Sequence, residues 1–160
     1  MRRLVILFLL FICLLAGGLQ VQRAFASRNS SSQQKLRTFR FGNVELQLEV
    51  AKTDAERRKG LSGRSRLESN QAMVFLFPEA DIYDFWMKDT YFPLDILWLY
   101  QGKVVDMTTL PAQIAGKAPA QYSPKAIADQ VIEVSAGLAK AQEIGIGSVL
   151  QIPKLCKEIP

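Results

Sequence analysis

Beyond its first 26 residues, the sequence is a succession of short apolar runs that have the length and pattern of β-strands. In the first run, Val44, Leu46, Leu48 and Val50 alternate with polar residues, a period of two that is typical of a half-buried strand. Further strands are predicted over residues 73–77, 84–88, 94–100, 103–109, 131–134 and 149–152. Strands therefore dominate the predicted fold.

Turn and capping signals complete this prediction. Thr53-Asp54-Ala55-Glu56 has the pattern of a capping box, which predicts a short helix that Gly60 ends. Gln101-Gly102 indicates a hairpin turn, and Ser135 is expected to cap a second short helix that runs to Ala141. We expect a mostly β, α+β fold: an antiparallel-rich sheet, partly closed like a barrel, with two short helices.

The N-terminal segment has the pattern of an export signal. Arg2 and Arg3 precede an uncharged, apolar stretch over 4–19, and Ala24-Phe25-Ala26 is a small-x-small cleavage site. Cleavage would leave Ser27 first, whereas an uncleaved segment would anchor the chain. The apolar stretch is shorter than the roughly 20 residues that a spanning helix needs, which favours cleavage.

The expected organisation follows from this segment. Residues 1–26 are the signal or anchor, 27–36 a polar tether, and 37–160 one globular domain. The domain is expected outside the cytoplasm, in the periplasm or on the extracellular side of the inner membrane. Contact with the membrane is expected only through an uncleaved N-terminal segment.

Charge and composition exclude several classes of function. The chain carries 20 Lys and Arg against 15 Asp and Glu, but Arg2, Arg3 and Arg23 belong to the predicted signal, so 17 basic residues remain. No basic stripe with interleaved aromatic residues is left, so nucleic acid is not an expected partner. The absence of His excludes a His-dependent triad and a His-ligated zinc. No cofactor and no metal are predicted.

Cys156 would have no intramolecular partner after cleavage, because Cys13 belongs to the predicted signal. It would then either pair between chains in an oxidising compartment or serve as a small apolar residue.

The densest group of functional side chains lies over residues 84–90. In a strand, Asp84, Trp86 and Lys88 share one face, where the indole offers flat area and the charges offer orientation to a small ligand. The structural alternative places Trp86 in the core and pairs Lys88 with Asp84 or Asp95. The candidate ligand-binding residues are Trp86, Lys88, Asp89 and Asp95, and the supporting candidates are Arg57, Asp84, Thr90 and Tyr122.

Two further features bear on this candidate cleft. Asp95 interrupts an apolar run, so its carboxylate needs donors or a cation, as part of a structural ion pair or of acid–base chemistry. The Pro-rich stretch from Leu110 to Lys125 is either a functional loop that covers the cleft or a spacer across one end of the sheet. Asp84, Asp89, Asp95 and Asp106 match no metal-binding loop motif.

Taken together, these residues resemble domain-of-unknown-function family 192. The resemblance covers nearly all of residues 39–152 and is carried by Arg57, Gly60-Leu61, Met73-Val74-Phe75-Leu76-Phe77, Phe85-Trp86-Met87-Lys88, Asp89-Thr90, Pro93-Leu94-Asp95-Ile96, Gly102, residues 131–133, Ala136-Gly137 and Ile144-Gly145. It implies a compact, mostly β fold in a small exported or membrane-tethered prokaryotic protein. It implies no activity, because the family has no settled one.

The sequence departs from the pattern of that family at three positions. Asp89 stands where the family usually has Asn, Ser62 where it usually has Met, and Ser148 where it usually has Asp. The change at Asp89 adds a negative charge beside Lys88 and removes an amide donor.

Three functional hypotheses follow. The first is an envelope binding domain that holds a small polar ligand, or a segment of an envelope protein, in the cleft beside Trp86. The second is a carboxylate-dependent hydrolase of envelope glycans, which requires two carboxyl groups about 5–9 Å apart across an open cleft. The third is a structural domain that packs on another envelope protein through an apolar patch or a strand edge.

Overall fold

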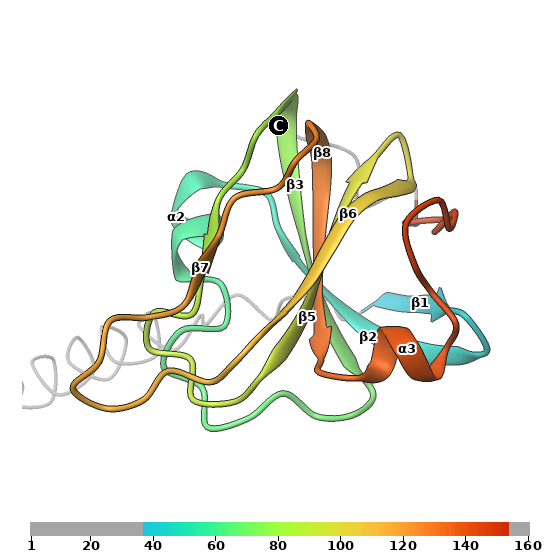
Figure 1. Cartoon of the computed structure of the whole chain (residues 1–160). Coiled ribbons are helices and arrows are strands. Elements are labelled where there is room, and N and C mark those ends of the chain that lie inside the picture. The colour runs from blue at the N-terminus through green and yellow to red at the C-terminus, as the bar shows by residue number, and fades with distance from the viewer. Residues whose placement is uncertain (1–36, 154–160) are drawn as a thin grey trace, which may run out of the picture. The chain divides into compact units, whose positions relative to one another are not determined.

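A computed structural model describes residues 37–153, which form a six-stranded mixed sheet and a separate two-stranded sheet (Figure 1). The large sheet has the order β1-β2-β3-β8-β5-β6, and β4 pairs with β7. The strands are β1 (Arg37–Phe41), β2 (Val44–Ala51), β3 (Gln71–Asp81), β4 (Phe85–Trp86), β5 (Leu94–Tyr100), β6 (Lys103–Leu110), β7 (Gln121–Tyr122) and β8 (Ala128–Ser135), and the helices are α2 (Asp54–Lys59) and α3 (Leu138–Ala141). The predictions for residues 1–26, 27–36 and Cys156 lie outside the described residues.

The large sheet is open, which corrects the expected partial closure into a barrel. Its outer strands, β1 and β6, do not pair with each other, and every neighbouring pair is antiparallel except β2 and β3. The parallel β2–β3 pair requires a crossover, and α2 lies within it. A closed sheet would enclose one of its faces, whereas both faces of this open sheet are covered by apolar cores. The prediction of a mostly β, α+β fold with two short helices is confirmed.

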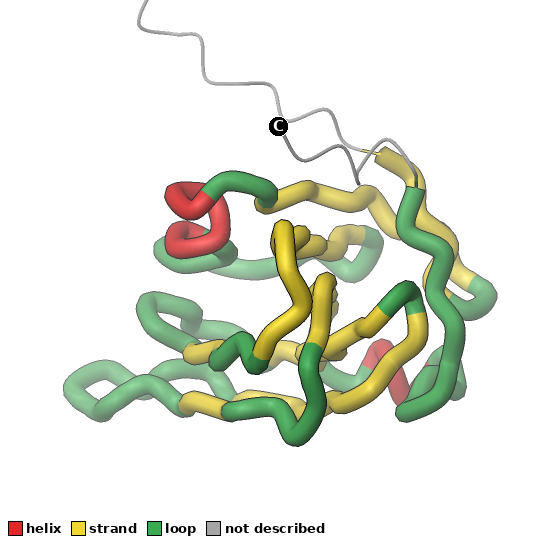
Figure 2. The backbone as a smooth tube through the Cα atoms, turned by 90° about the horizontal axis from the view of Figure 1, so that it is seen from above, coloured by secondary structure: helices red, strands yellow, loops and turns green. Residues whose placement is uncertain are grey.

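Each face of the sheet has its own apolar core. One core contains Phe39, Phe41, Val74 and Ile132 and packs against α3. The other contains Phe75, Met87, Ile96, Trp98 and Val131 and lies on the side of β4 and β7. Figures 1 and 2 show α2 and α3 on opposite sides of the sheet.

Several local predictions are confirmed. The strand over 44–50 is β2, and the capping box is present at α2, where the amide of Glu56 donates to Thr53 Oγ1 (3.2 Å) and the amide of Thr53 to Glu56 Oε2 (2.9 Å). Gln101 and Gly102 form the β5–β6 turn with positive φ angles of 52° and 81°, as a tight hairpin requires.

Other local predictions are wrong. β3 continues through Pro78 to Asp81, because the β3–β8 pairing is irregular between Leu76 and Asp81 and does not need the missing N–H of proline. The strand predicted over 84–88 is only Phe85–Trp86. Ser135 ends β8 and does not cap α3, whose N-cap, Gly137, offers no side-chain acceptor.

Two strands were not predicted. β1 places Phe39 and Phe41 in the core, although the alternation of these residues with Thr38 and Arg40 is short. β7 lies inside the Pro-rich stretch and pairs with β4.

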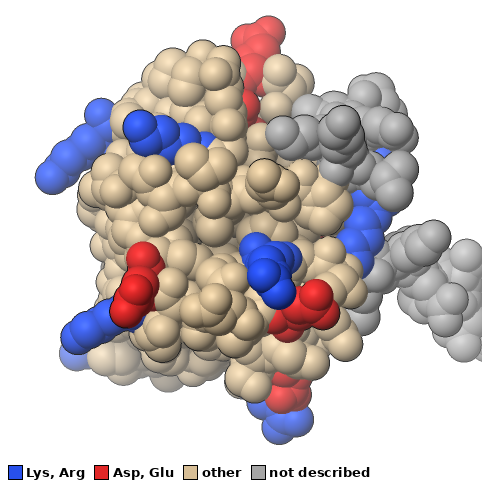
Figure 3. All heavy atoms as spheres, turned by 90° about the vertical axis from the view of Figure 1, so that its right-hand side faces the viewer, with Lys and Arg blue, Asp and Glu red and all other residues tan. Residues whose placement is uncertain are grey.

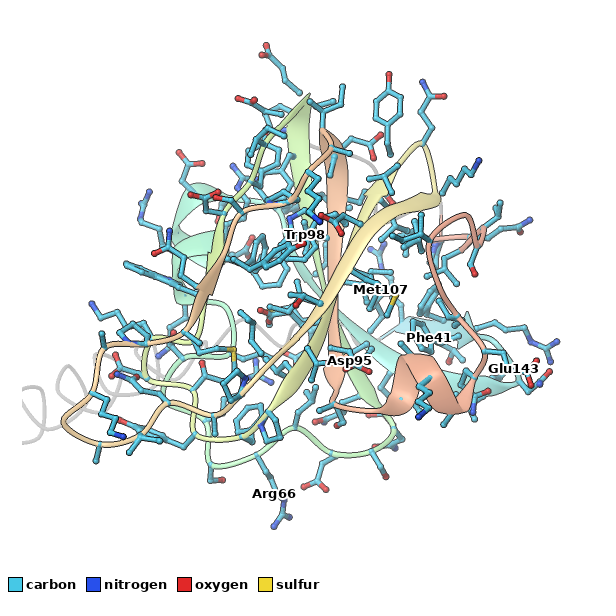
Figure 4. The ribbon with its side chains drawn as sticks, in the orientation of Figure 1. Phe41, Arg66, Asp95, Trp98, Met107 and Glu143 are labelled. Carbon is cyan, nitrogen blue, oxygen red and sulfur yellow. The ribbon has the colours of Figure 1, made fainter. Side chains whose placement is uncertain are left out.

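Asp95 supplies the capping interaction that α3 lacks in its own sequence. Its carboxylate is 2% exposed and accepts hydrogen bonds from the amide of Ala139 (3.1 Å) and from Thr109 Oγ1 (2.7 Å). Asp95 and Trp98 point to opposite faces of the sheet, Asp95 toward α3 (Figure 4). A carboxylate on β5 therefore ties α3 to the sheet.

We expect Asp95→Asn to lower the free energy of unfolding by about 1–3 kcal/mol, because a buried charged acceptor with two donors is replaced by a neutral amide. Urea denaturation of the variant and the wild type measures this difference. Glu45→Gln, an exposed position on β2, is the control and should stay within about 0.5 kcal/mol of the wild type. Equal losses for the two variants would contradict the assigned role.

Candidate functional site

A pocket of about 320 Å³ opens between α2, β3 and the segment that leads into β4. It is lined by Asp54, Arg57, Arg58, Phe75, Phe77, Tyr83, Asp84, Phe85 and Trp86. The pocket therefore lies on the face of the sheet opposite to α3.

The aromatic side of the pocket is held by ring contacts. Phe77 and Tyr83 are stacked, with centroids 3.5 Å apart and planes 13° apart. Phe85 meets Phe75 edge-on at 4.9 Å and Trp98 at 5.7 Å, so the core fixes its position. Trp86 is 54% exposed, so much of its side chain is accessible to solvent.

Most charged groups of the pocket already have partners. Nη1 of Arg57 donates to the carbonyls of Lys52 (2.6 Å) and Leu76 (2.7 Å), and Nη2 pairs with Asp54 (2.5 Å). Asp84 accepts hydrogen bonds from Ser123 Oγ (2.5 Å) and Gln121 Nε2 (3.5 Å).

Two cations remain. Arg58 is exposed and has no ion pair within residues 37–153, and Lys88 places Nζ 5.6 Å from the centroid of the Trp86 ring. Among the residues that line the pocket, Arg58 and Asp84 are thus the charged side chains without an ion pair to another described residue, because the donors to Asp84 are neutral.

A second, much smaller pocket of about 30 Å³ adjoins the first and shares Arg57, Arg58, Phe75, Phe85 and Trp86 with it. The stretch after α2 forms part of its lining. Gly60 has a φ of +44°, and a Cβ atom there would lie 3.3 Å from Cζ of Phe75, so the chain needs glycine at this point.

Glu133 reaches the smaller pocket from the middle of β8. It is paired in register with Met73 of β3 and Ile96 of β5, and it is 5% exposed. Within the described residues, its Oε2 atom has no hydrogen-bond partner. Burial raises the pKa of Glu133 to about 8, although the charge of Arg64 opposes this shift.

The charge of Arg64 is engaged elsewhere. Its two terminal nitrogens donate to the two carboxylate oxygens of Glu49, at 2.5 and 2.7 Å, and this bond raises the pKa of Arg64. Glu133 is consequently protonated at neutral pH and offers an O–H donor.

The sequence matches the family DUF192, described as an uncharacterised ACR, over residues 37–152. The chain belongs to DUF192. The resemblance to domain-of-unknown-function family 192 is thereby confirmed. No curated protein matches the chain.

Solved structures share the fold. A protein from Sinorhizobium meliloti 1021, described as a candidate transcription regulator, is 28% identical with a TM-score of 0.59, and the match covers 68% of this chain and 82% of that one. A protein of unknown function from Novosphingobium aromaticivorans DSM 12444 is 26% identical with a TM-score of 0.63, and the match covers 78% of this chain and 90% of that one.

The departures from the DUF192 pattern have local explanations. Asp89 has a φ of +53°, a left-handed conformation that Asp and Asn both accept more readily than most residues. Ser148 Oγ accepts a hydrogen bond from the backbone amide of Gly145 (3.0 Å). Ser62 Oγ donates to the carbonyl of Lys88 (2.8 Å).

The structure brings together some of the predicted site residues. Arg57, Asp84 and Trp86 line the larger pocket, and Thr90 lines the smaller one. Lys88 lies over the ring of Trp86.

The remaining candidates lie elsewhere. Asp95 is on the other face of the sheet, and the amide of Asp89 donates to Gln113 Oε1 (2.6 Å) in an exposed turn. The hydroxyl of Tyr122 donates to Asp106 (3.2 Å), and burial and this carboxylate raise the pKa of Tyr122.

The Pro-rich stretch does not line either pocket. The backbone amide of Gln113 donates to the carbonyl of Thr90 (2.8 Å), and the backbone amide of Met87 donates to the carbonyl of Ala120 (2.8 Å). The stretch therefore braces the segment after β4.

Sequence reasoning missed Arg58, Tyr83 and Glu133. Glu133 carried a usable signal, a carboxyl group within the apolar run 131–134, which is the pattern that drew attention to Asp95. Arg58 and Tyr83 are brought to the pocket by the crossover and by the bend after β3, which a linear pattern does not show.

The part of the chain that the structure describes contains no group of three or more His, Cys, Asp or Glu residues placed to hold a metal ion. It also contains no helix long and apolar enough to cross a membrane. On the face shown in Figure 3, Lys and Arg lie apart from one another among uncharged residues, with acidic residues between them.

We expect the free energy of unfolding to fall as the pH rises from about 4.5 to about 8, because the unfolded chain loses the Glu133 proton first. The slope from this group is at most about 1.4 kcal/mol per pH unit, and its contribution is constant below and above that window. Denaturant titrations across this pH window should show that the free energy of unfolding of Glu133→Gln depends less steeply on pH than that of the wild type, by this slope.

The matched control is Glu143→Gln, which replaces an exposed carboxyl group. It should keep the wild-type slope. A Glu133→Gln protein with an unchanged slope would show that Glu133 ionises in the folded state as it does in the unfolded chain.

Proposed function

We propose that this DUF192 domain binds a small organic anion with a planar, apolar body in the larger pocket. The observation that carries the proposal is the exposed side chain of Trp86 at a pocket that is also lined by Arg58, a cation with no ion pair within residues 37–153. The ring would stack on the ligand, and the guanidinium would pair with its carboxylate.

The form of the pocket supports this ligand class. Its volume of about 320 Å³ is at the lower end of the range for small-molecule sites, and several aromatic residues line it. Asp54 is neutralised by Arg57, whereas the donors to Asp84 are neutral, so the anionic end of the ligand would lie toward Arg58 and away from Asp84. Of the four candidate ligand-binding residues predicted from the sequence, this proposal retains Trp86, and it adds Arg58.

The positions of Asp89 and Asp95, the two candidate carboxyl groups for a glycan hydrolase, do not favour that alternative. It needs two carboxyl groups facing one cleft. Asp95 is held by Thr109 and Ala139 on the face opposite to the pockets, so it cannot act together with Asp89.

We expect benzoate or indole-3-acetate to bind the wild-type domain in isothermal titration calorimetry, and Trp86→Ala to weaken that binding at least about tenfold, or about 1.4 kcal/mol. Arg58→Gln should weaken it as well, with a reduced dependence on salt. Tyr91→Ala is the matched control, because Tyr91 is 55% exposed and lines neither pocket. A folded Trp86→Ala protein that binds these anions with the wild-type affinity would contradict the proposal.

Export is part of the proposed function, on the strength of the sequence of residues 1–26. In a bacterial host, we expect the intact mass of the protein in the periplasmic fraction to correspond to a chain that begins at Ser27. Ala26→Arg should block this processing, whereas Ser30→Arg, beyond the cleavage site, should not. A full-length chain recovered in the membrane fraction would favour the anchor, and one in the cytoplasm would contradict export.

A further inference from the structure

Two buried side-chain oxygens lack a hydrogen-bond partner within the described residues, Gln130 Oε1 and Glu133 Oε2. Glu133 lines the smaller pocket, beside Ser62, Thr90 and Trp86. A buried polar atom without a partner lowers the stability of the fold, so an unpartnered oxygen on a residue that lines a pocket indicates a missing contact.

The other buried acids on the sheet show what a purely structural carboxyl group looks like here. Asp95 accepts from Thr109 and Ala139, Asp106 accepts from Tyr122 and from the amide of Lys125, and Glu49 is bound bidentately by Arg64. Glu133 is the exception among these acids.

We propose that Glu133 is the inner contact of the same binding site, where its protonated carboxyl group donates a hydrogen bond to an oxygen of the bound anion. This inference rests on the proposed function and specifies its ligand further. The smaller pocket, at about 30 Å³, has room for a water molecule or one small polar group but not for a ring. The ligand therefore has a slender oxygen-bearing end, such as a carboxylate, and a planar body that stays in the larger pocket.

The charges around Glu133 are compatible with this arrangement. On α2, Arg57 is neutralised by Asp54, while Arg58 and Lys59 line the smaller pocket and favour an anion. Glu49 on β2 and Arg64 after α2 neutralise each other, and the register neighbours of Glu133 on β3 and β5, Met73 and Ile96, are uncharged.

Binding should then be linked to a proton. An ionised Glu133 would repel the anion, whereas the protonated group donates to it. With the pKa of Glu133 at about 8, the competent form dominates at neutral pH and declines above it. At alkaline pH, binding of the anion is consequently coupled to the uptake of a proton by Glu133.

The experiment uses benzoate as the probe and calorimetry as the readout. Between about pH 6.5 and about pH 9.5, the affinity of the wild type for benzoate should fall about 30-fold, because the fraction of the protein in which Glu133 is protonated falls by that factor. At about pH 8.5, titrations in two buffers with different ionisation enthalpies should show an uptake of about 0.75 protons for each benzoate bound.

Glu133→Gln keeps a donor but cannot titrate, so it should bind with an affinity that varies little with pH and without proton uptake. Asp95→Asn, a buried acid on the other face, should retain the wild-type pH dependence. Should Glu133→Gln fail to fold, the proton uptake of the wild type decides the matter without a variant.

The two proposals can fail separately. Binding of benzoate with a constant affinity and no proton uptake would overturn the role of Glu133 and leave the proposed function intact. Absence of binding at about pH 6.5, where Glu133 is protonated, would overturn the proposed function and this inference with it.

Discussion

The burial of β3, β8 and β5 on both faces is the constraint from which the rest of the structure follows. These strands form the middle of the sheet, so each must present side chains to two separate apolar cores. Covering one face requires α3, and covering the other requires the crossover through α2 and the β4–β7 pair. The pockets lie where this second cover is incomplete, between α2 and the residues that lead into β4.

The same constraint gives the carboxyl groups of the sheet their different roles. Asp95 and Glu49 lie on opposite faces, and each is neutralised or hydrogen-bonded by residues of the layer that covers it. Glu133 lies on the face where the covering layer leaves the smaller pocket. Within the described residues, no group of that layer forms a hydrogen bond with its Oε2 atom. Its burial is thus a consequence of strand position, and its lack of a partner is a consequence of the gap in the covering layer.

The fold was predictable where a pattern depends on neighbouring residues. The alternation of β2, the capping box at Thr53 and the turn at Gln101-Gly102 are local signals, and each is present. Strand order, the open sheet and the capping of α3 by Asp95 depend on contacts between distant segments. For the same reason, the sequence identified Trp86, Arg57 and Asp84 at the pocket but placed Asp95 on the wrong face and did not find Arg58 or Glu133.

The order of the strands has a consequence for how the chain folds. β8 is the last strand within residues 37–153 and lies between β3 and β5, so this sheet cannot be completed until residues up to 135 are available. Before that, β1–β2–β3 and β5–β6 each expose an unsatisfied edge, and joining them requires contacts of long sequence separation, which form slowly. A chain whose last strand joins two earlier halves can complete its sheet only after most of it has been synthesised.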